Sequence, residues 1–206
     1  GKNIYTFQQT YSSLINSCNN NNNGDILSSR NRIDEKIRTI VDPEPNGEKI
    51  KTDLIGNTIP GWTFNYLSEF QTFNIDNTIK GNERIEYLIS LKLLASNELK
   101  PHDAQIKIVY SLNDNGWYIN ELKEVFITYV NVAPLNEWLN ITPLQNCNYN
   151  RIDQGHKYYV QDPCTGQTIE QGPDRQEVSL HCNNVYIKSR ESTPVEIIFK
   201  YFPQAN

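Results

Sequence analysis

A run of alternating apolar and polar residues between positions 83 and 130 constrains the fold more than any other feature. The apolar members of its first two segments are Ile85, Tyr87, Ile89, Leu91 and Leu93, followed by Ala104, Ile106, Ile108, Tyr110 and Leu112. A turn signal at 113–116 then leads directly into Trp117 and a third segment. Side chains alternate between the two faces of a strand, so this period marks a sheet with one buried and one wet face. The pattern predicts a three-stranded antiparallel meander.

The third segment changes phase after Ile119, because Leu122 and Phe126 fall on the opposite parity. A β-bulge near residues 120–121 explains this change, and bulges bend sheets. The first segment, 83–95, would also suit a helix, but its alternation is unbroken over nine residues. We therefore predict three strands and a bent sheet.

Two helices are predicted ahead of the sheet. Residues 3–17 and 26–41 each carry apolar side chains at helical spacing, and the asparagine run at 19–23 separates them. Pro43 ends the second helix. A helical hairpin on the concave side of a curved antiparallel sheet makes this an α+β fold, with a first domain over residues 1–130.

The rest of the chain, residues 131–206, has a different character. Its predicted strands are short and are separated by proline, glycine and asparagine turns. They run over 157–161, 167–171, 177–182, 185–190 and 195–202. We therefore expect a small β-rich C-terminal subdomain.

The charge and hydropathy of the chain restrict its partners and its location. A net charge of −5 over 206 residues argues against nucleic acid or an anionic membrane as the main partner. No apolar run approaches the roughly 20 residues of a membrane span, so no transmembrane segment is expected. The sequence has no methionine and opens on Gly1, which favours a leader that has been removed, either a signal peptide or a lipid-anchored lipoprotein leader. A secreted, periplasmic or cell-surface location follows from this.

The four cysteines fit two disulfides, which would agree with an oxidising compartment. Cys164–Cys182 closes a modest loop in the turn-rich β region and is the preferred pair. Cys18–Cys147 is the pairing that remains. Four free buried thiols in a cytosolic protein are the alternative.

Acid/base and metal chemistry have few candidates. Asp153 could orient His156 three residues later as a general base, but Gly155 makes the segment resemble a turn. A zinc site built from His156, Cys164, His181 and Cys182 lacks a C-x-x-C pair, so neither a metal nor a cofactor is expected. His102, which follows a proline, is expected in a solvated loop.

Aromatic residues give a better indication of a binding site. Trp62, Tyr66, Tyr87, Tyr110 and Trp117 would gather if the curved sheet closed around them. They are the candidate ligand-binding residues, although the same positions would also suit a plain hydrophobic core.

Two N-terminal helices, long antiparallel strands, and the turn–Gly–Trp step at 113–119 together resemble the NTF2-like (cystatin-type) α+β superfamily over about residues 3–130. The resemblance implies helices packed into a curved sheet that encloses a cone-shaped pocket. It does not cover residues 131–206, and no catalytic pair of that superfamily matches positions in this chain.

These observations favour an extracytoplasmic, non-enzymatic binding or interaction protein. Its ligand would be a small molecule, a glycan or a protein, held in the concave pocket or on the C-terminal β region. A small hydrolase or isomerase that uses the same pocket is one alternative. A structural cell-surface component is another.

Overall fold

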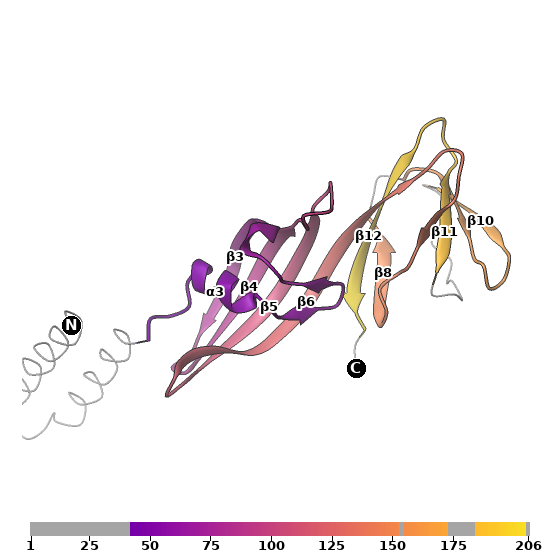
Figure 1. Ribbon diagram of the computed structural model, residues 1–206. Helices are drawn as coiled ribbons and strands as arrows, with labels where there is room; N and C mark the ends of the chain where they lie inside the picture. Colours follow the sequence, from indigo (N-terminus) through magenta and orange to yellow (C-terminus); the bar gives the residue numbers. More distant parts are fainter. Residues whose placement is uncertain (1–41, 153–154, 173–183, 205–206) are drawn as a thin grey trace, which may run out of the picture. The chain divides into compact units, whose positions relative to one another are not determined.

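The computed structural model describes residues 42–152, 155–172 and 184–204, and these residues form a mostly β structure (Figure 1). Strands account for 57% of the described residues and helical turns for 7%, with one α-helix and three sheets. The predicted α+β class, a helical hairpin packed on a sheet, is therefore wrong. The two predicted helices, 3–17 and 26–41, lie outside the described residues.

The largest sheet has six strands in the order β3-β4-β5-β6-β12-β8, and every neighbouring pair is antiparallel. Its strands are β3 (Phe70–Lys80), β4 (Arg84–Leu93), β5 (His102–Asn113), β6 (Gly116–Ala133), β12 (Val195–Pro203) and β8 (Cys147–Arg151). The predicted meander is confirmed as β4, β5 and β6, joined in sequence order.

The β-bulge predicted near residues 120–121 is also confirmed. Tyr110 pairs with Ile119 and Val109 with Glu121, which leaves Asn120 as the extra residue. A second bulge, which the sequence analysis missed, lies at Val125. Each bulge reverses the parity of β6, so the side chains that face the core change phase twice along one strand.

The smaller sheet has four strands in the order β10-β9-β11-β7. They are β10 (Thr168–Gln171), β9 (Tyr158–Gln161), β11 (Val185–Ser189) and β7 (Leu139–Ile141). The predicted strands 157–161, 167–171, 185–190 and 195–202 are confirmed as β9, β10, β11 and β12, while 177–182 lies outside the described residues. A third sheet is the short hairpin of β1 (Thr58–Ile59) and β2 (Trp62–Thr63).

β12 joins the C-terminal part of the chain to the meander. It pairs with β6 from Val195 opposite Ala133 to Tyr201 opposite Ile127, and its other edge pairs with β8. β6 runs without interruption through positions 130 and 131. β12 therefore extends the sheet that contains the meander β4-β5-β6.

Two elements cover the core face of the six-stranded sheet. Asn46 is the N-cap of helix α3 (Gly47–Leu54). Its side chain accepts a hydrogen bond from the Lys49 amide at 2.9 Å. The helix buries Ile50 and Leu54 completely, and Figure 1 shows it beside β3, β4 and β5. The β1–β2 hairpin turns at Gly61, where φ is +82° and a Cβ would lie 2.6 Å from a Leu144 methyl group.

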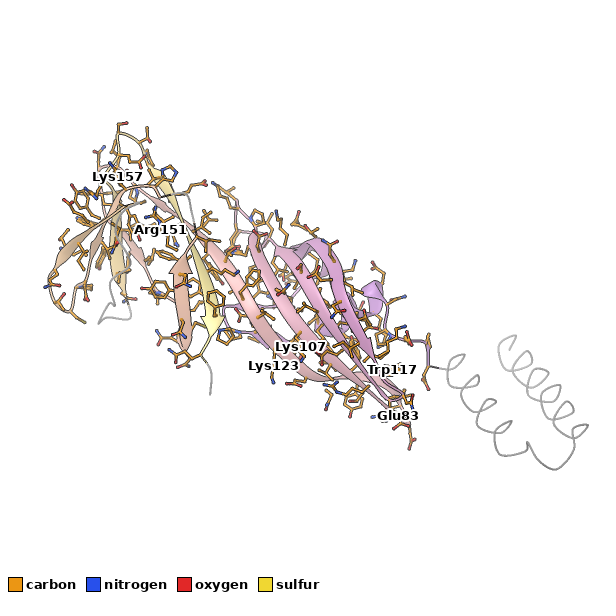
Figure 2. The ribbon with its side chains drawn as sticks, turned by 180° about the vertical axis from the view of Figure 1, so that it is seen from behind. Glu83, Lys107, Trp117, Lys123, Arg151 and Lys157 are labelled. Atoms are coloured by element: carbon orange, nitrogen blue, oxygen red, sulfur yellow. The ribbon has the colours of Figure 1, made fainter. Side chains whose placement is uncertain are left out.

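The outer face of the sheet carries charged side chains that pair with one another, both across strands and along one strand. Lys107 lies 2.8 Å from Glu86, and Lys123 pairs with Glu121. Figure 2 shows Lys107 and Lys123 on neighbouring strands. The alternation thus separates an apolar core face from a charged face in water.

We expect Leu54→Ala to lower the free energy of unfolding by about 3 kcal/mol, because it removes a fully buried side chain between α3 and the sheet. Urea denaturation followed by circular dichroism measures this loss. Leu99→Ala is the matched control, since Leu99 is 98% exposed and should change stability by less than about 0.5 kcal/mol. Equal effects of the two substitutions would contradict the packing of α3.

Candidate functional site

The structure does not bring the five predicted ligand-binding aromatics into one site. Tyr87 and Tyr110 are buried and touch edge to face, with ring centroids 6.0 Å apart. Tyr66 is 67% exposed, Trp62 is buried against His102, and Trp117 packs against the rim of the core. Ligand binding by any of the five stays a prediction.

Tyr110 shows why such residues belong to the core. Its hydroxyl donates a 2.8 Å hydrogen bond to Asp53 of α3. Burial, together with this carboxylate, raises the pKa of Tyr110 far above its ordinary value. The residue fixes the helix on the sheet and offers no free hydroxyl to a ligand.

His102 is buried, so its predicted place in a solvated loop is wrong. Its Nδ1 lies 2.9 Å from the Thr128 carbonyl, and its Nε2 lies 2.6 Å from a Glu98 carboxylate oxygen. The imidazole ring also packs against Tyr129, with centroids 4.4 Å apart, and against Trp62. Alternation with Ala104 and Ile106 was the signal in the sequence that could have placed it on the core face.

Glu124 is the least expected residue of this region. After the bulge at Asn120, Glu124 shares the parity of Leu122 and faces the core opposite Ile106, where it is 8% exposed. Neither of its carboxylate oxygens has a hydrogen-bond partner in the described part of the chain. Burial raises the pKa of Glu124 to about 7, because the loss of water destabilises the charged carboxylate.

The Glu124 carboxyl also helps to raise the pKa values of two neighbouring side chains. Burial, together with Glu98 and Glu124, raises the pKa of Tyr129 to about 12. Burial, and to a smaller extent the charge of Glu124, raises the pKa of the Cys147 thiol. The indole Nε1 of Trp62, which packs on the same His102, is likewise buried without a hydrogen-bond partner in the described residues. This cluster can hold a proton near neutral pH, but it is closed to a large ligand.

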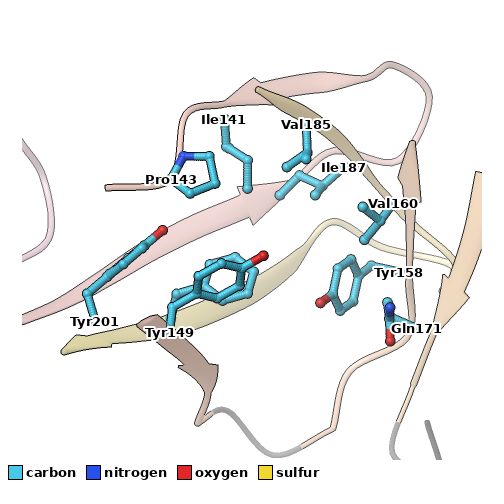
Figure 3. Close-up of a pocket in the computed structure, with 10 residues that line it drawn as sticks. Ile141, Pro143, Tyr149, Tyr158, Val160, Gln171, Val185, Ile187 and Tyr201 are labelled. Carbon is cyan, nitrogen blue, oxygen red and sulfur yellow. The ribbon is translucent and has the colours of Figure 1, made fainter. Parts of the chain in front are cut away.

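A small cavity lies between the two larger sheets (Figure 3). Its volume is about 20 Å³, which is room for roughly one water molecule. Side chains from both sheets converge on it, among them Tyr149 and Tyr201 from one, and Tyr158, Val160 and Gln171 from the other. A cavity of this size can hold water, not a substrate.

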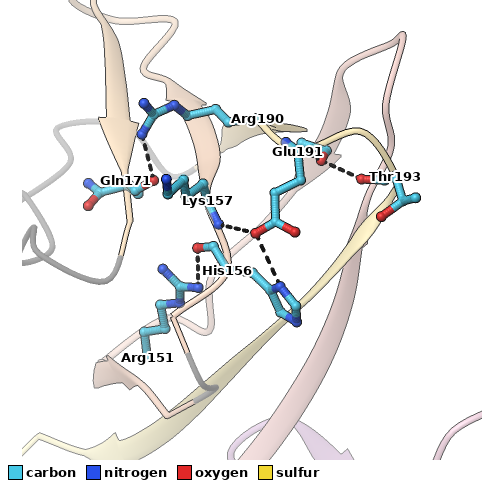
Figure 4. Close-up of polar contacts among 8 residues, drawn as sticks. Arg151, His156, Lys157, Gln171, Arg190, Glu191 and Thr193 are labelled. Atoms are coloured by element: carbon cyan, nitrogen blue, oxygen red, sulfur yellow. Dashed lines mark hydrogen bonds and ion pairs between the residues drawn. The ribbon is translucent and has the colours of Figure 1, made fainter.

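The predicted acid/base pair is only partly visible, because Asp153 lies outside the described residues. His156 Nδ1 lies 3.2 Å from a carboxylate oxygen of Glu191, a residue 35 positions away (Figure 4). The same oxygen accepts the Lys157 amide at 2.9 Å, and Arg151 donates to the His156 carbonyl. The hydrogen bond from the Lys157 amide, followed by that from His156, lowers the pKa of the partly exposed Glu191 carboxyl. These contacts join two loops at the surface.

The solvent face of the four-stranded sheet presents a set of aromatic and cationic side chains that sequence reasoning did not identify. Lys188 of β11 pairs with Tyr159 of β9, which pairs with Glu170 of β10. The Lys188 ammonium lies 4.8 Å from the centre of the Trp138 ring and 5.7 Å from that of Tyr159. We call Trp138, Lys188 and Tyr159 the aromatic–cation row. Alternation within β9 and β11 was the signal that could have revealed it.

The aromatic–cation row is half exposed and carries one unpaired charge. Arg190, whose guanidinium lies 5.4 Å from the Tyr159 ring, is paired with Glu170 at 2.9 Å. Lys188 has no carboxylate within ion-pair distance among the described residues. Its ammonium is therefore held by the aromatic faces and remains available to an anion.

The cysteines are in two different states. Cys147 is a free, buried thiol, so it forms no disulfide with Cys18. Cys164 is disulfide-bonded. Because Cys18 and Cys182 lie outside the described residues, the preferred pairing of Cys164 with Cys182 stays a prediction.

No cluster of three or more metal-binding side chains occurs among the described residues. His156 and Cys164 of the rejected zinc set belong to this part, and His181 and Cys182 lie outside it. The described part of the chain also contains no helix with the length and hydropathy of a membrane span.

No family model matches the chain, and no curated protein or solved structure shows significant similarity to it. The resemblance to the NTF2-like superfamily therefore stays a prediction. Function must be argued from the residues themselves.

We expect Glu124→Gln to make the protein more stable above neutral pH. The folded-state pKa of about 7 lies above the ordinary 4.5, so the folded wild type binds more protons between these values and loses stability as pH rises through them. The loss approaches about 3 kcal/mol at pH 8, and the glutamine variant should escape it.

Urea denaturation of both proteins from pH 4 to pH 8 measures this difference. Glu121→Gln on the same strand is the matched control, because the hydrogen bond from Lys123 and the charge of that ammonium lower the pKa of the Glu121 carboxyl. Parallel pH profiles for wild type and Glu124→Gln would show that Glu124 is not the buried, unpaired acid described above.

Proposed function

We propose that this chain is a non-catalytic binding protein that acts outside the cytoplasm and holds its ligand on the solvent face of the four-stranded sheet. The observation that carries the proposal is the aromatic–cation row. Half-exposed aromatic rings give a large contact area at a small cost in conformational entropy. An ammonium with no carboxylate beside it among the described residues adds a fixed charge for recognition.

The filled interior also supports binding at the surface. Tyr87, Tyr110 and Ile106 occupy the core face of the curved sheet, where the cone-shaped pocket was expected. The cavity between the two larger sheets has room for about one water molecule. Ligand pockets are usually several hundred Å³ in volume. The core face and this cavity are therefore packed too closely to hold a ligand of that size.

The extracytoplasmic location is supported by the cysteine chemistry. Cys164 is disulfide-bonded and lies in an exposed turn between β9 and β10. Disulfides persist in oxidising compartments and are rare in the cytosol. The net negative charge of the chain is compatible with a secreted binding protein and gives no attraction to nucleic acid.

An enzyme remains the second candidate, and Glu124 is the observation that favours it. A buried carboxyl with a pKa of about 7 has the protonation behaviour of a general acid or base. Its 8% exposure argues against contact with a large substrate. A hydrolase or isomerase activity abolished by Glu124→Gln, and unchanged in Glu121→Gln, would establish this alternative.

An array of defined oligosaccharides and peptides, both neutral and charged, tests the binding function on the full chain. We expect at least one class of ligand to bind the wild type, and Trp138→Ala/Lys188→Ala to weaken that binding at least tenfold. Tyr118→Ala/Lys123→Ala is the matched control, since it removes an exposed aromatic ring and an exposed ammonium from β6.

The melting temperatures of all three proteins should agree within a few degrees, because the changed side chains are at the surface. Equal binding by wild type and the Trp138/Lys188 variant would refute the proposed surface. An array on which the wild type binds nothing would refute the binding function itself.

A further inference from the structure

A second row of side chains lies beside the aromatic–cation row on the same face. The strand registers place Asn140 of β7 opposite Tyr186 of β11, Tyr186 opposite Gln161 of β9, and Gln161 opposite Thr168 of β10. Neighbouring strands are about 4.8 Å apart, so the four residues form a straight line across the sheet. We call them the polar row.

The described residues make no polar contact with the side chains of the polar row. Asn140 and Thr168 are exposed, and Tyr186 and Gln161 are half buried. None of these four side chains makes a hydrogen bond or an ion pair within the described part of the chain. Among the described residues, no group satisfies these amides and hydroxyls, which can both donate and accept.

The inner side of the same strands fixes these rows in place. Val160, Ile187 and Tyr158 alternate with the exposed residues and are buried between the sheets (Figure 3). Because a strand cannot rotate one side chain outward without turning its neighbours, the buried residues set the direction of the polar and aromatic ones. The face is therefore organised before any ligand arrives.

The charge of the face points to an anionic ligand. Arg190 is neutralised by Glu170, whereas Lys188 is neighboured by rings and by no carboxylate in the described residues. An ammonium that gains a carboxylate partner forms a charge-assisted hydrogen bond. A ligand that carries a carboxylate would complete this interaction.

The chemistry of the two rows fits a sugar better than a protein surface. The centre of a protein–protein interface is usually apolar and poor in charged residues, while this face combines rings, amides, hydroxyls and an ammonium. A pyranose ring has C–H groups that pack on the negative face of an aromatic ring. Its hydroxyl groups can donate to and accept from amides such as Asn140 and Gln161.

We propose that the ligand of this face is an acidic polysaccharide built from uronic acid residues. The sugar rings pack against Trp138 and Tyr186, the hydroxyl groups bind the polar row, and one carboxylate binds the Lys188 ammonium. This inference rests on the proposed binding function and adds the class of ligand.

Isothermal titration of the full chain with hexagalacturonate, and with the neutral galactohexaose of the same linkage, tests the proposal. We expect hexagalacturonate to bind at least fivefold more tightly than the neutral sugar. Lys188→Met keeps the apolar stem of the side chain and removes its charge, so it should erase this preference. Trp138→Ala should weaken both sugars, and Tyr118→Ala should weaken neither.

The salt dependence gives a second readout that a purely structural role would not change. Binding of hexagalacturonate to wild type should weaken as sodium chloride rises, and Lys188→Met should show a smaller slope. Equal affinity for the two sugars, or a preference that survives in Lys188→Met, would overturn the assignment of an acidic sugar.

A hexaglutamate peptide separates the failure of this inference from the failure of the proposed function. If the peptide binds through Trp138 and Lys188 and hexagalacturonate does not, the face binds acidic peptides and the sugar assignment is wrong. If neutral galactohexaose binds through Trp138 as tightly as the acid, the face binds sugars without regard to charge. If none of the three probes binds, the acidic-polysaccharide assignment fails, and the wider array decides whether the binding function survives.

Discussion

The structure depends on the pairing of β6 along both of its edges. β6 is 18 residues long. Its first part pairs with β5, and its last part pairs with β12. Each ladder satisfies backbone groups that would otherwise lose hydrogen bonds on burial. The last strand of the chain is thus added to a meander that begins more than 100 residues earlier, and β8 is added to that strand in turn.

The two bulges of β6 determine which of its side chains face the core. The bulge at Asn120 turns Leu122 and Glu124 to the core face, and the bulge at Val125 shifts the phase again so that Ile127 is buried. Glu124 is left without a hydrogen-bond partner among the described residues. The buried acid therefore lies in the core of the large sheet. The exposed aromatic and polar rows lie on the smaller sheet, where no bulge interrupts the alternation. We expect the buried acid to make stability depend on pH, and we propose the exposed rows as the ligand-binding surface.

Alternation predicted the meander and the bulge at Asn120, because both follow from the period of side chains along a single strand. It did not predict α3, since its Ile50 and Leu54 lie in a polar stretch too short for a clear helical period. The partners of β12 and of Lys188 could not be predicted either. Pairing between distant strands depends on register and on three-dimensional packing, which single-sequence patterns do not contain.

Native-state hydrogen exchange measured by NMR tests the central position of β6 most directly. If β12 completes the large sheet, the amides of Ile197 and Phe199 should exchange with the same free energy as those of Ile106 and Ile108 in β5, through unfolding of the whole unit. Exchange of the β12 amides through a separate, lower-energy opening, with the β5 amides still protected, would contradict the account.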